Sequence, residues 1–229
     1  MSQESQNSGH TEANADVAVV ISTYNRPKAL HLVLEGLSRQ KVQARQIIVG
    51  DDGSTEETRD VIESWRSRGL PVEHWWHEDH GYRKSVIMNQ AVRAVNQPLC
   101  IFTDGDCIPL EGFVRDHLHY AEAGYILAGP RMLASAALTR RLEQGEECCL
   151  GRNIVWWLGQ RARGNINRLM PLIHLPDGAW RKSAPTKWEW VRGCNFSVET
   201  KHVWRVGGFE ENLFGWGPDD SDIAVRMIN

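Results

Sequence analysis

The sequence lacks the features that mark several large protein classes. Its 229 residues carry a net charge of −3 and show no basic stripe with interleaved aromatic residues, so we expect no nucleic-acid partner. No apolar run reaches the roughly 18 residues that a membrane-spanning helix needs. The five cysteines are odd in number and form no Cys-x-x-Cys pair, so neither a disulfide framework nor a cysteine zinc site is expected.

The N-terminal region also lacks the signals of a targeting segment. Residues 1–16 are rich in Ser, Gln, Asn and Glu, without the basic start and apolar middle of a signal peptide. We expect a disordered tail there. A cytoplasmic location follows as the default, with peripheral association at the inner face of the membrane left open.

Two common phosphate-binding motifs are missing. No Gly-x-Gly-x-x-Gly follows the first expected strand, and the chain has no Walker A sequence. If a phosphorylated ligand binds, another device must hold it, and a divalent cation held by carboxylates is the usual alternative. The composition is unusually rich in tryptophan, with ten residues. Each of them can either pack in the hydrophobic core or stack against a sugar ring.

The hydrophobic pattern of the first half alternates between strand and helix. Short apolar runs at 17–21, 47–49, 71–76 and 99–102 predict strands, and helical spacing follows the first three from Leu30, Val61 and Met88. This alternation predicts an α/β fold with a mostly parallel sheet flanked by helices. Further along, we expect helix and loop over 138–168, a strand within 188–196 and a helix over 221–227.

Polar clusters follow three of these strands, and ligands of such sheets bind at the carboxyl ends of strands. The clusters are Thr23 to Arg26, Asp51 to Ser54, and Asp104 to Asp106. Two carboxylates separated by one residue can share a hard cation, although Asp-Gly is also a common turn. A phosphatase with an aspartyl nucleophile fits less well, because Ile108 follows the motif and three strands precede it.

The most specific segment lies near the end of the sequence. Residues 214–222 read Phe-Gly-Trp-Gly-Pro-Asp-Asp-Ser-Asp. A tryptophan can stack a sugar, and a carboxylate beside it can act as general base toward an acceptor hydroxyl. An ordinary N-cap before a C-terminal helix explains the same acids without a function.

Taken together, the motifs resemble glycosyltransferase family 2, whose members have the GT-A fold. The C-terminal part resembles the branch similar to β-1,4-galactosyltransferases and bacterial chondroitin-type polymerases. The segments that carry the resemblance stand in family order at 20–27, 49–54, 80–89, 103–107, 206–211 and 214–222. The resemblance implies a single GT-A domain, with a nucleotide-sugar-binding half at 17–130 and an acceptor-binding, catalytic half at 131–229.

The resemblance also implies roles for individual residues. The donor-binding residues would be Thr23, Tyr24, Asn25, Arg26, Asp51, Asp52, Arg83, Lys84 and Asp104. Asp106 would ligate Mn²⁺ or Mg²⁺ with help from Asp104, and Asp220 would be the catalytic base. Trp216 and Asp219 would hold the acceptor.

These roles imply an inverting transfer from a nucleotide-sugar, a UDP-sugar by preference, to a saccharide or glycolipid acceptor in surface polysaccharide or glycolipid synthesis. Two other interpretations stay open: a non-catalytic glycan- or nucleotide-binding domain and, with less support, a nucleotidyltransferase. In this branch a His metal ligand follows the Gly-Trp-Gly segment, and this sequence has no His after Asp220. We therefore expect either a fragment or a metal site completed elsewhere, with His202 as a weak candidate.

Overall fold

The structure is a computed structural model that describes residues 14–173, 176–182, 188–213 and 217–228. Its centre is a six-stranded sheet in the order β3-β2-β1-β4-β6-β5. Strands β1 to β4 pair in parallel, whereas β6 runs antiparallel to both β4 and β5. Their bounds are Ala15–Thr23 (β1), Ala44–Asp51 (β2), Val72–Trp76 (β3), Leu99–Asp104 (β4), Leu127–Ala128 (β5) and Phe196–Glu199 (β6).

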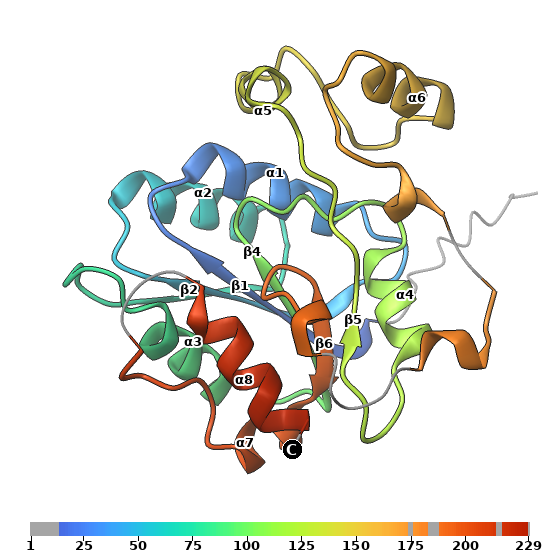
Figure 1. Ribbon diagram of the computed structural model, residues 1–229. Coiled ribbons are helices and arrows are strands. Elements are labelled where there is room, and N and C mark those ends of the chain that lie inside the picture. Colours follow the sequence, from blue (N-terminus) through green and yellow to red (C-terminus); the bar gives the residue numbers. More distant parts are fainter. Residues whose placement is uncertain (1–13, 174–175, 183–187, 214–216, 229) are drawn as a thin grey trace, which may run out of the picture.

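Helices cover both faces of this sheet (Figure 1). On one face lie α1 (Pro27–Ser38) and α2 (Glu56–Ser67), and α4 (Phe113–Tyr120) packs against the same core through Val114. On the other lie α3 (Lys84–Arg93), α7 (Thr200–Arg205) and α8 (Pro218–Ile228). Successive residues of β1 serve opposite cores, because Val19 and Ile21 pack in the first and Val20 in the second.

The second core joins the two ends of the sequence. Val20 and Ile48 from the first half pack in one buried cluster with Phe196 and Ile223 from the last forty residues. The rings of Phe102 and Phe196 stack with centroids 4.6 Å apart across the β4–β6 pair. The C-terminal helix is therefore part of the sheet's own core, which brings its first turn to the carboxyl ends of the parallel strands.

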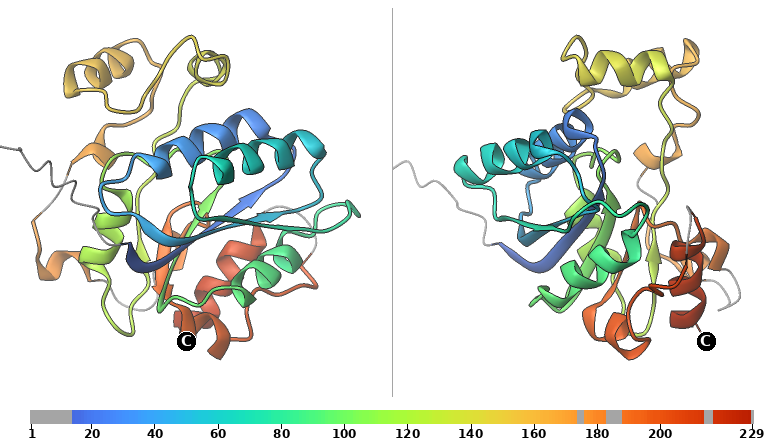
Figure 2. Two further views of the ribbon diagram at one scale, coloured as in Figure 1. Left: turned by 180° about the vertical axis from the view of Figure 1, so that it is seen from behind. Right: turned by 90° about the vertical axis from the view of Figure 1, so that its left-hand side faces the viewer.

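A smaller unit stands out from the sheet. Residues 131–173, here called the lobe, include α5 (Ala136–Glu143) and α6 (Ile154–Ala162). Figure 2 shows the two helices as a layer of their own beyond α1 and α2. The lobe has its own small core, in which Leu138, Leu142 and Trp157 are buried.

The expected parallel strands and their helices are confirmed, with shifted ends. β1 begins at Ala15 rather than at residue 17, and α8 begins at Pro218 rather than at residue 221. The strand expected within 188–196 is wrong: Trp188–Trp190 forms a 3-10 turn and the strand begins only at Phe196. Both Trp188 and Trp190 are exposed, so the apolar run does not mark a buried strand.

Among the described residues, no helix combines the length and the apolar character needed to cross a bilayer. All five cysteines are free.

Candidate active site

The carboxyl ends of β1, β2 and β4 bring the three polar clusters to one edge of the sheet. Ser22 of β1 lies in register with Asp104 of β4, and its hydroxyl donates to Asp104 Oδ1 at 2.8 Å. Thr23 lies in register with Asp51 of β2. The Thr23 hydroxyl is buried without a hydrogen-bond partner among the described residues. Gly105 passes close to this hydroxyl, since a Cβ there would lie 2.8 Å from Thr23 Oγ1.

Asp51 and Asp52 are buried, and each of their four carboxylate oxygens has a partner. Asp51 accepts from the Ser54 amide at 2.9 Å and pairs with His74 Nε2 at 2.9 Å. Asp52 pairs with His77 Nε2 at 2.7 Å and accepts from the Arg83 amide at 3.0 Å. Burial raises the pKa of Asp52, although these contacts oppose the shift. The pair therefore ties the ends of β2 and β3 to the start of α3.

The loop after β1 is locked to the same region. Asn25 has a positive φ of 48°, a conformation that asparagine tolerates better than most residues. The backbone amide of Asn25 donates to Ser54 Oγ at 2.8 Å, and the side-chain oxygen of Asn25 accepts from the Thr55 backbone amide at 3.0 Å. The Tyr24 hydroxyl donates to Asp79 Oδ2 at 2.8 Å. Tyr24 itself is half-exposed, so its ring faces a space open to a ligand.

Lys84 joins the donor-side carboxylate to the C-terminal helix. Its ammonium lies 3.4 Å from Asp104, 3.5 Å from Asp219 and 3.4 Å from Asp220. Burial lowers the pKa of Lys84, but the three carboxylates outweigh this and hold the pKa above its ordinary value. No other ion pair reaches these three carboxylates in the part of the chain that the structure describes. The group therefore carries excess negative charge.

Asp220 lies in the first turn of α8, and its carboxylate packs directly against the backbone of Gly193. The Gly193 amide donates to Asp220 Oδ2 at 3.0 Å. A Cβ on Gly193 would lie only 2.1 Å from Asp220 Oδ1, so any other residue must displace the carboxylate. Burial raises the pKa of Asp220, and Asp219 and Asp104 add to the rise against the opposing effect of Lys84. A carboxylate with a raised pKa is a stronger base than an ordinary one.

Several residues of the site were not expected from the sequence. Gly193, His74 and His77 support the aspartates, and the Tyr82 hydroxyl donates to Asp219 Oδ2 at 3.3 Å. Burial and the nearby Asp219 raise the pKa of Tyr82 above its ordinary value, which keeps it a donor. These histidines and the tyrosine lie near the recognised motifs, and that position was the available signal. Their hydrogen-bond partners could not be predicted, because the partners lie far away in the sequence.

Asp106 and Arg26 lie at the outer rim of the site. The Asp106 side chain is half-exposed and lies 3.9 Å from the Arg26 guanidinium. Arg26 also donates to Glu143 of α5 at 2.9 Å, so the lobe contacts the rim directly. Arg83 reaches the site through its backbone amide, as described above. Trp216 lies outside the described residues.

One expected aspartate, Asp104, also belongs to a group of three side chains that could ligate a metal. Asp104, Cys107 and Cys194 have ligand atoms within 4.8 Å of one another. This group was not expected from the sequence, because the two cysteines lie on separate segments that only the fold brings together. His202, the weak candidate for a third ligand, does not reach this region: it pairs with Glu199 at the far end of β6.

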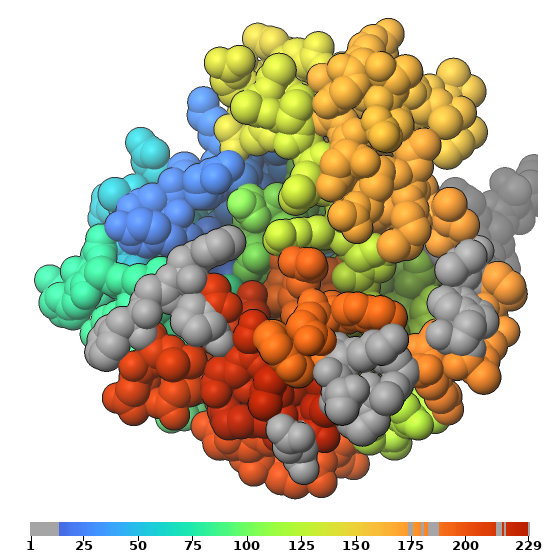
Figure 3. All heavy atoms as spheres, viewed as in Figure 1, coloured from blue at the N-terminus to red at the C-terminus, as the bar shows by residue number. Residues whose placement is uncertain are grey.

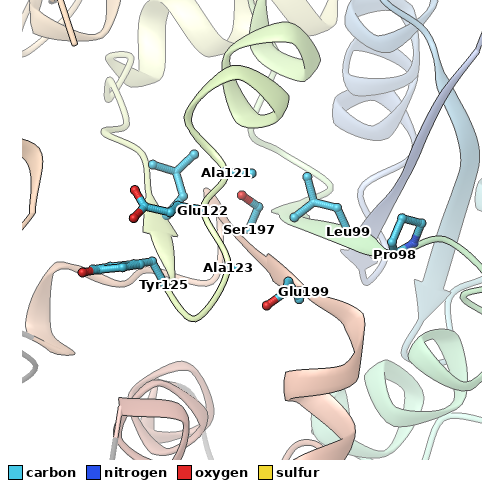
Figure 4. A pocket seen from close by; sticks show the side chains of 9 residues that line it. Pro98, Leu99, Ala121, Glu122, Ala123, Tyr125, Ser197 and Glu199 are labelled. Atoms are coloured by element: carbon cyan, nitrogen blue, oxygen red, sulfur yellow. The ribbon is translucent and has the colours of Figure 1, made fainter. Parts of the chain in front are cut away.

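The cavity drawn in Figure 4 lies at the opposite end of the sheet. It has a volume of about 200 Å³ and is lined by Pro98 and Leu99 at the start of β4, Glu199 at the end of β6, and the 121–127 segment. None of the expected site residues lines it. The site at the carboxyl ends is instead defined by its convergent polar side chains.

Comparison with known proteins places this geometry in a family. The family model described as glycosyl transferase family 2 matches residues 18–180, and that described as the N-terminal domain of galactosyltransferase matches residues 179–229. A validoxylamine A glucosyltransferase of Streptomyces hygroscopicus is 30% identical over 236 residues, which cover 92% of this chain and 51% of that protein. A chondroitin synthase of Escherichia coli is 24% identical over 92% of this chain and 32% of its own length. The chain thus spans about half the length, or less, of these relatives.

Solved structures agree on the fold. A mannosyltransferase of Pyrobaculum calidifontis in complex with GDP-Man and Mn²⁺ superposes with a TM-score of 0.59 at 15% identity, covering 94% of this chain and 52% of that one. The structure of S. aureus TarS 1-349 in complex with UDP-GlcNAc superposes with a TM-score of 0.59 at 15% identity, covering 93% of this chain and 53% of that one. The GT-A fold is therefore confirmed, with its mixed, mostly parallel sheet flanked by helices. Because the family model matches well over half of the chain, the protein belongs to glycosyltransferase family 2.

Proposed function

We propose that this chain is the catalytic region of an inverting glycosyltransferase that uses a divalent cation, Mn²⁺ or Mg²⁺. It moves a sugar from a nucleotide-sugar, a UDP-sugar by preference, to a hydroxyl of a saccharide or glycolipid acceptor. The observation that carries the proposal is the meeting of Asp104 and Asp220 around Lys84, because it joins the expected donor side to the expected acceptor side.

The residues present fit a hard divalent cation. Asp104, Asp219 and Asp220 share the single ammonium of Lys84, so the negative charge of the three carboxylates exceeds the positive charge beside them. Oxygen ligands of this kind suit Mg²⁺ and Mn²⁺. Asp106, half-exposed at the rim, would hold the ion together with Asp104. When bound, the ion stabilises the negative charge of the departing nucleoside diphosphate.

Asp220 is the proposed general base. Its raised pKa and its fixed position against Gly193 suit a group that accepts the proton of an acceptor hydroxyl as that hydroxyl attacks. Asp219, held by Tyr82, orients the acceptor from the same helical turn. Attack from the side opposite to the leaving group inverts the anomeric centre, and no covalent intermediate is needed.

The donor half supplies binding and orientation. Tyr24, Asn25 and Arg26 follow β1 and face the same edge as Asp51 and Asp52, which suits the base and ribose of a nucleoside. Lys84 lies deeper, where its ammonium can bind a phosphate oxygen once the cation neutralises the aspartates. Arg83 starts the same helix and adds positive charge on that side.

The test is a transfer assay with a panel of donors. The chain is incubated with Mn²⁺, a saccharide acceptor mixture and each of UDP-glucose, UDP-galactose, UDP-N-acetylglucosamine and GDP-mannose, and the released nucleoside diphosphate is measured. We expect release with a UDP-sugar that stops when the metal is chelated, and an inverted anomeric signal in the NMR spectrum of the product. Nucleotide binding without any release in all arms would support a non-catalytic binding domain instead. Pyrophosphate formation from a nucleoside triphosphate would indicate a nucleotidyltransferase.

A further inference from the structure

The lobe exposes aliphatic side chains in a way that the rest of the described chain does not. Outside the lobe, the exposed large hydrophobic residues of the described ranges are all aromatic. The exposed aliphatic ones all lie in the lobe: Leu133, Ile154, Val155, Leu158, Met170 and Ile173. The space-filling view shows the lobe, in yellow to light orange, standing above the body of the molecule (Figure 3). Concentrated apolar exposure of this kind marks an interaction surface, whereas single exposed residues are ordinary.

Helix α6 presents part of this surface as one face. Ile154, Val155 and Leu158 follow the spacing that places residues on the same side of a helix. Val155 is 70% exposed, whereas Trp157 on the other side is buried in the small core of the lobe. The helix is therefore apolar on both sides, and only one side has a partner within the described chain.

The same lobe is strongly basic although the whole chain is acidic. Residues 131–173 contain seven arginines against three glutamates and no lysine or aspartate, while the chain carries −3. An open hollow of about 540 Å³ between α5 and the end of α6 is lined by Arg140, Arg141 and Arg163. Among the described residues, none of these three guanidinium groups makes a hydrogen bond or an ion pair. The Nε atom of Arg141 is buried without a hydrogen-bond partner among the described residues.

We propose that the lobe is a membrane-docking site that binds the phosphate groups of anionic phospholipids in the arginine hollow. The aliphatic face of α6 then lies in the interface between headgroups and acyl chains. Both features are needed for this partner, since an amphipathic surface gains from apolar burial and from attraction to anionic lipids together. A second copy of the chain would set like charge against like charge, and a nucleic acid would leave the aliphatic face in water.

Docking at the lobe would place the active site at the membrane. Glu143 of α5 accepts a hydrogen bond from Arg26 at the rim of the site, so the lobe contacts the loop that follows β1. If the acceptor is a glycolipid, docking would bring the active site to it, and this consequence rests on the proposed function. The docking itself is independent of it.

The experiment is sedimentation of the full chain with large vesicles. One set contains phosphatidylcholine alone, and the other contains one part phosphatidylglycerol to three parts phosphatidylcholine. We expect binding to the anionic vesicles that weakens as salt rises, and little binding to the neutral ones. Replacing the hollow arginines (R140Q, R141Q and R163Q together) should lower the partition onto anionic vesicles by about 100-fold, since each basic residue near such a surface contributes roughly a factor of five.

Two further variants make the result specific. V155S, at the most exposed aliphatic position, should weaken binding to the anionic vesicles without changing its salt dependence. The matched control replaces three exposed arginines outside the lobe, R68Q, R93Q and R205Q, and should leave binding within a few-fold of the original. Binding of UDP with Mn²⁺ is measured on every variant, so a damaged fold is separated from lost docking and the proposed function is judged by its own readout.

Three outcomes would overturn the proposal. The first is no binding to anionic vesicles at low salt. The second is equal loss in the control and in the hollow variant, which would mean attraction by net charge without a site. The third is a doubled mass in light scattering of the lipid-free chain that V155S abolishes, because the lobe would then be covered by a second copy.

Discussion

Two pairs of adjacent aspartates lie at the same edge of the sheet, and the fold treats them differently. In Asp51 and Asp52 every carboxylate oxygen has a close partner, supplied by two histidines and two backbone amides. In Asp219 and Asp220 one oxygen accepts from the Gly193 backbone amide at 3.0 Å, the contacts with side chains are longer, between 3.3 and 3.5 Å, and both acids compete for one ammonium. The first pair is stabilised as part of the scaffold. The second keeps charge and a base available for a ligand, so removing a carboxylate should have opposite effects in the two places.

The largest expected effect separates the pairs by activity. Asp220→Asn should lower kcat by a factor of about 10² to 10⁴, the usual loss when a general base is removed, and should leave UDP binding nearly unchanged. The measurement is steady-state transfer together with nucleotide titration. Asp222→Asn is the control, because Asp222 lies in the same helix but pairs with Arg226 and not with Lys84. Equal losses in both variants would mean that the helix, and not the base, was damaged.

A second change tests the position of the base without altering its charge. In Gly193→Ala the new Cβ must push the Asp220 carboxylate away. A displacement of about 1 Å can cost about 10²-fold in rate, so kcat should fall while UDP affinity holds. Gly159→Ala is the control, since the nearest atom to its Cβ is the flexible end of Arg163. An unchanged kcat in Gly193→Ala would contradict the role of Asp220.

The third effect is a shift in pH dependence. Lys84 lowers the pKa of Asp220, so Lys84→Met should raise that pKa further. A base acts when deprotonated, so the acid limb of kcat/KM should move to higher pH and activity should be lost sooner as the pH falls. Lys28→Met, at an exposed position in α1, should not move the limb. A limb that moves to lower pH would contradict the assignment of the base.

The smallest effect concerns stability and contrasts the pairs directly. Asp51→Asn breaks a buried contact with His74 and should lower the free energy of unfolding by about 1–3 kcal/mol. Asp219→Asn relieves repulsion among three carboxylates and should change stability little or raise it. Urea denaturation of both variants at neutral pH measures the difference. A larger loss in Asp219→Asn would reverse the comparison.

Much of this arrangement follows from local sequence signals, and the rest does not. The parallel strands were predictable because buried strands with helical spacing between them leave a clear pattern, and polar residues at their ends predict an edge site. The contact between Lys84 and Asp220 could not be predicted, because the two residues lie 136 positions apart in the sequence. Only the packing of α8 into the second core brings them together. Gly193 gave no signal either, since its role depends on the close approach of a distant carboxylate. The prediction of a strand within 188–196 was wrong because Trp188 and Trp190 are exposed, although in the sequence they look like part of a buried apolar strand.

The central claim is that Asp104 and Asp106 hold a cation that the nucleotide also binds. Calorimetric titration of UDP with and without Mn²⁺, on this chain and on Asp106→Ala, tests it most directly. We predict binding that requires Mn²⁺ and is lost in Asp106→Ala. Binding of equal strength with and without the metal, unaffected by the substitution, would contradict the claim and leave the site as a nucleoside pocket alone.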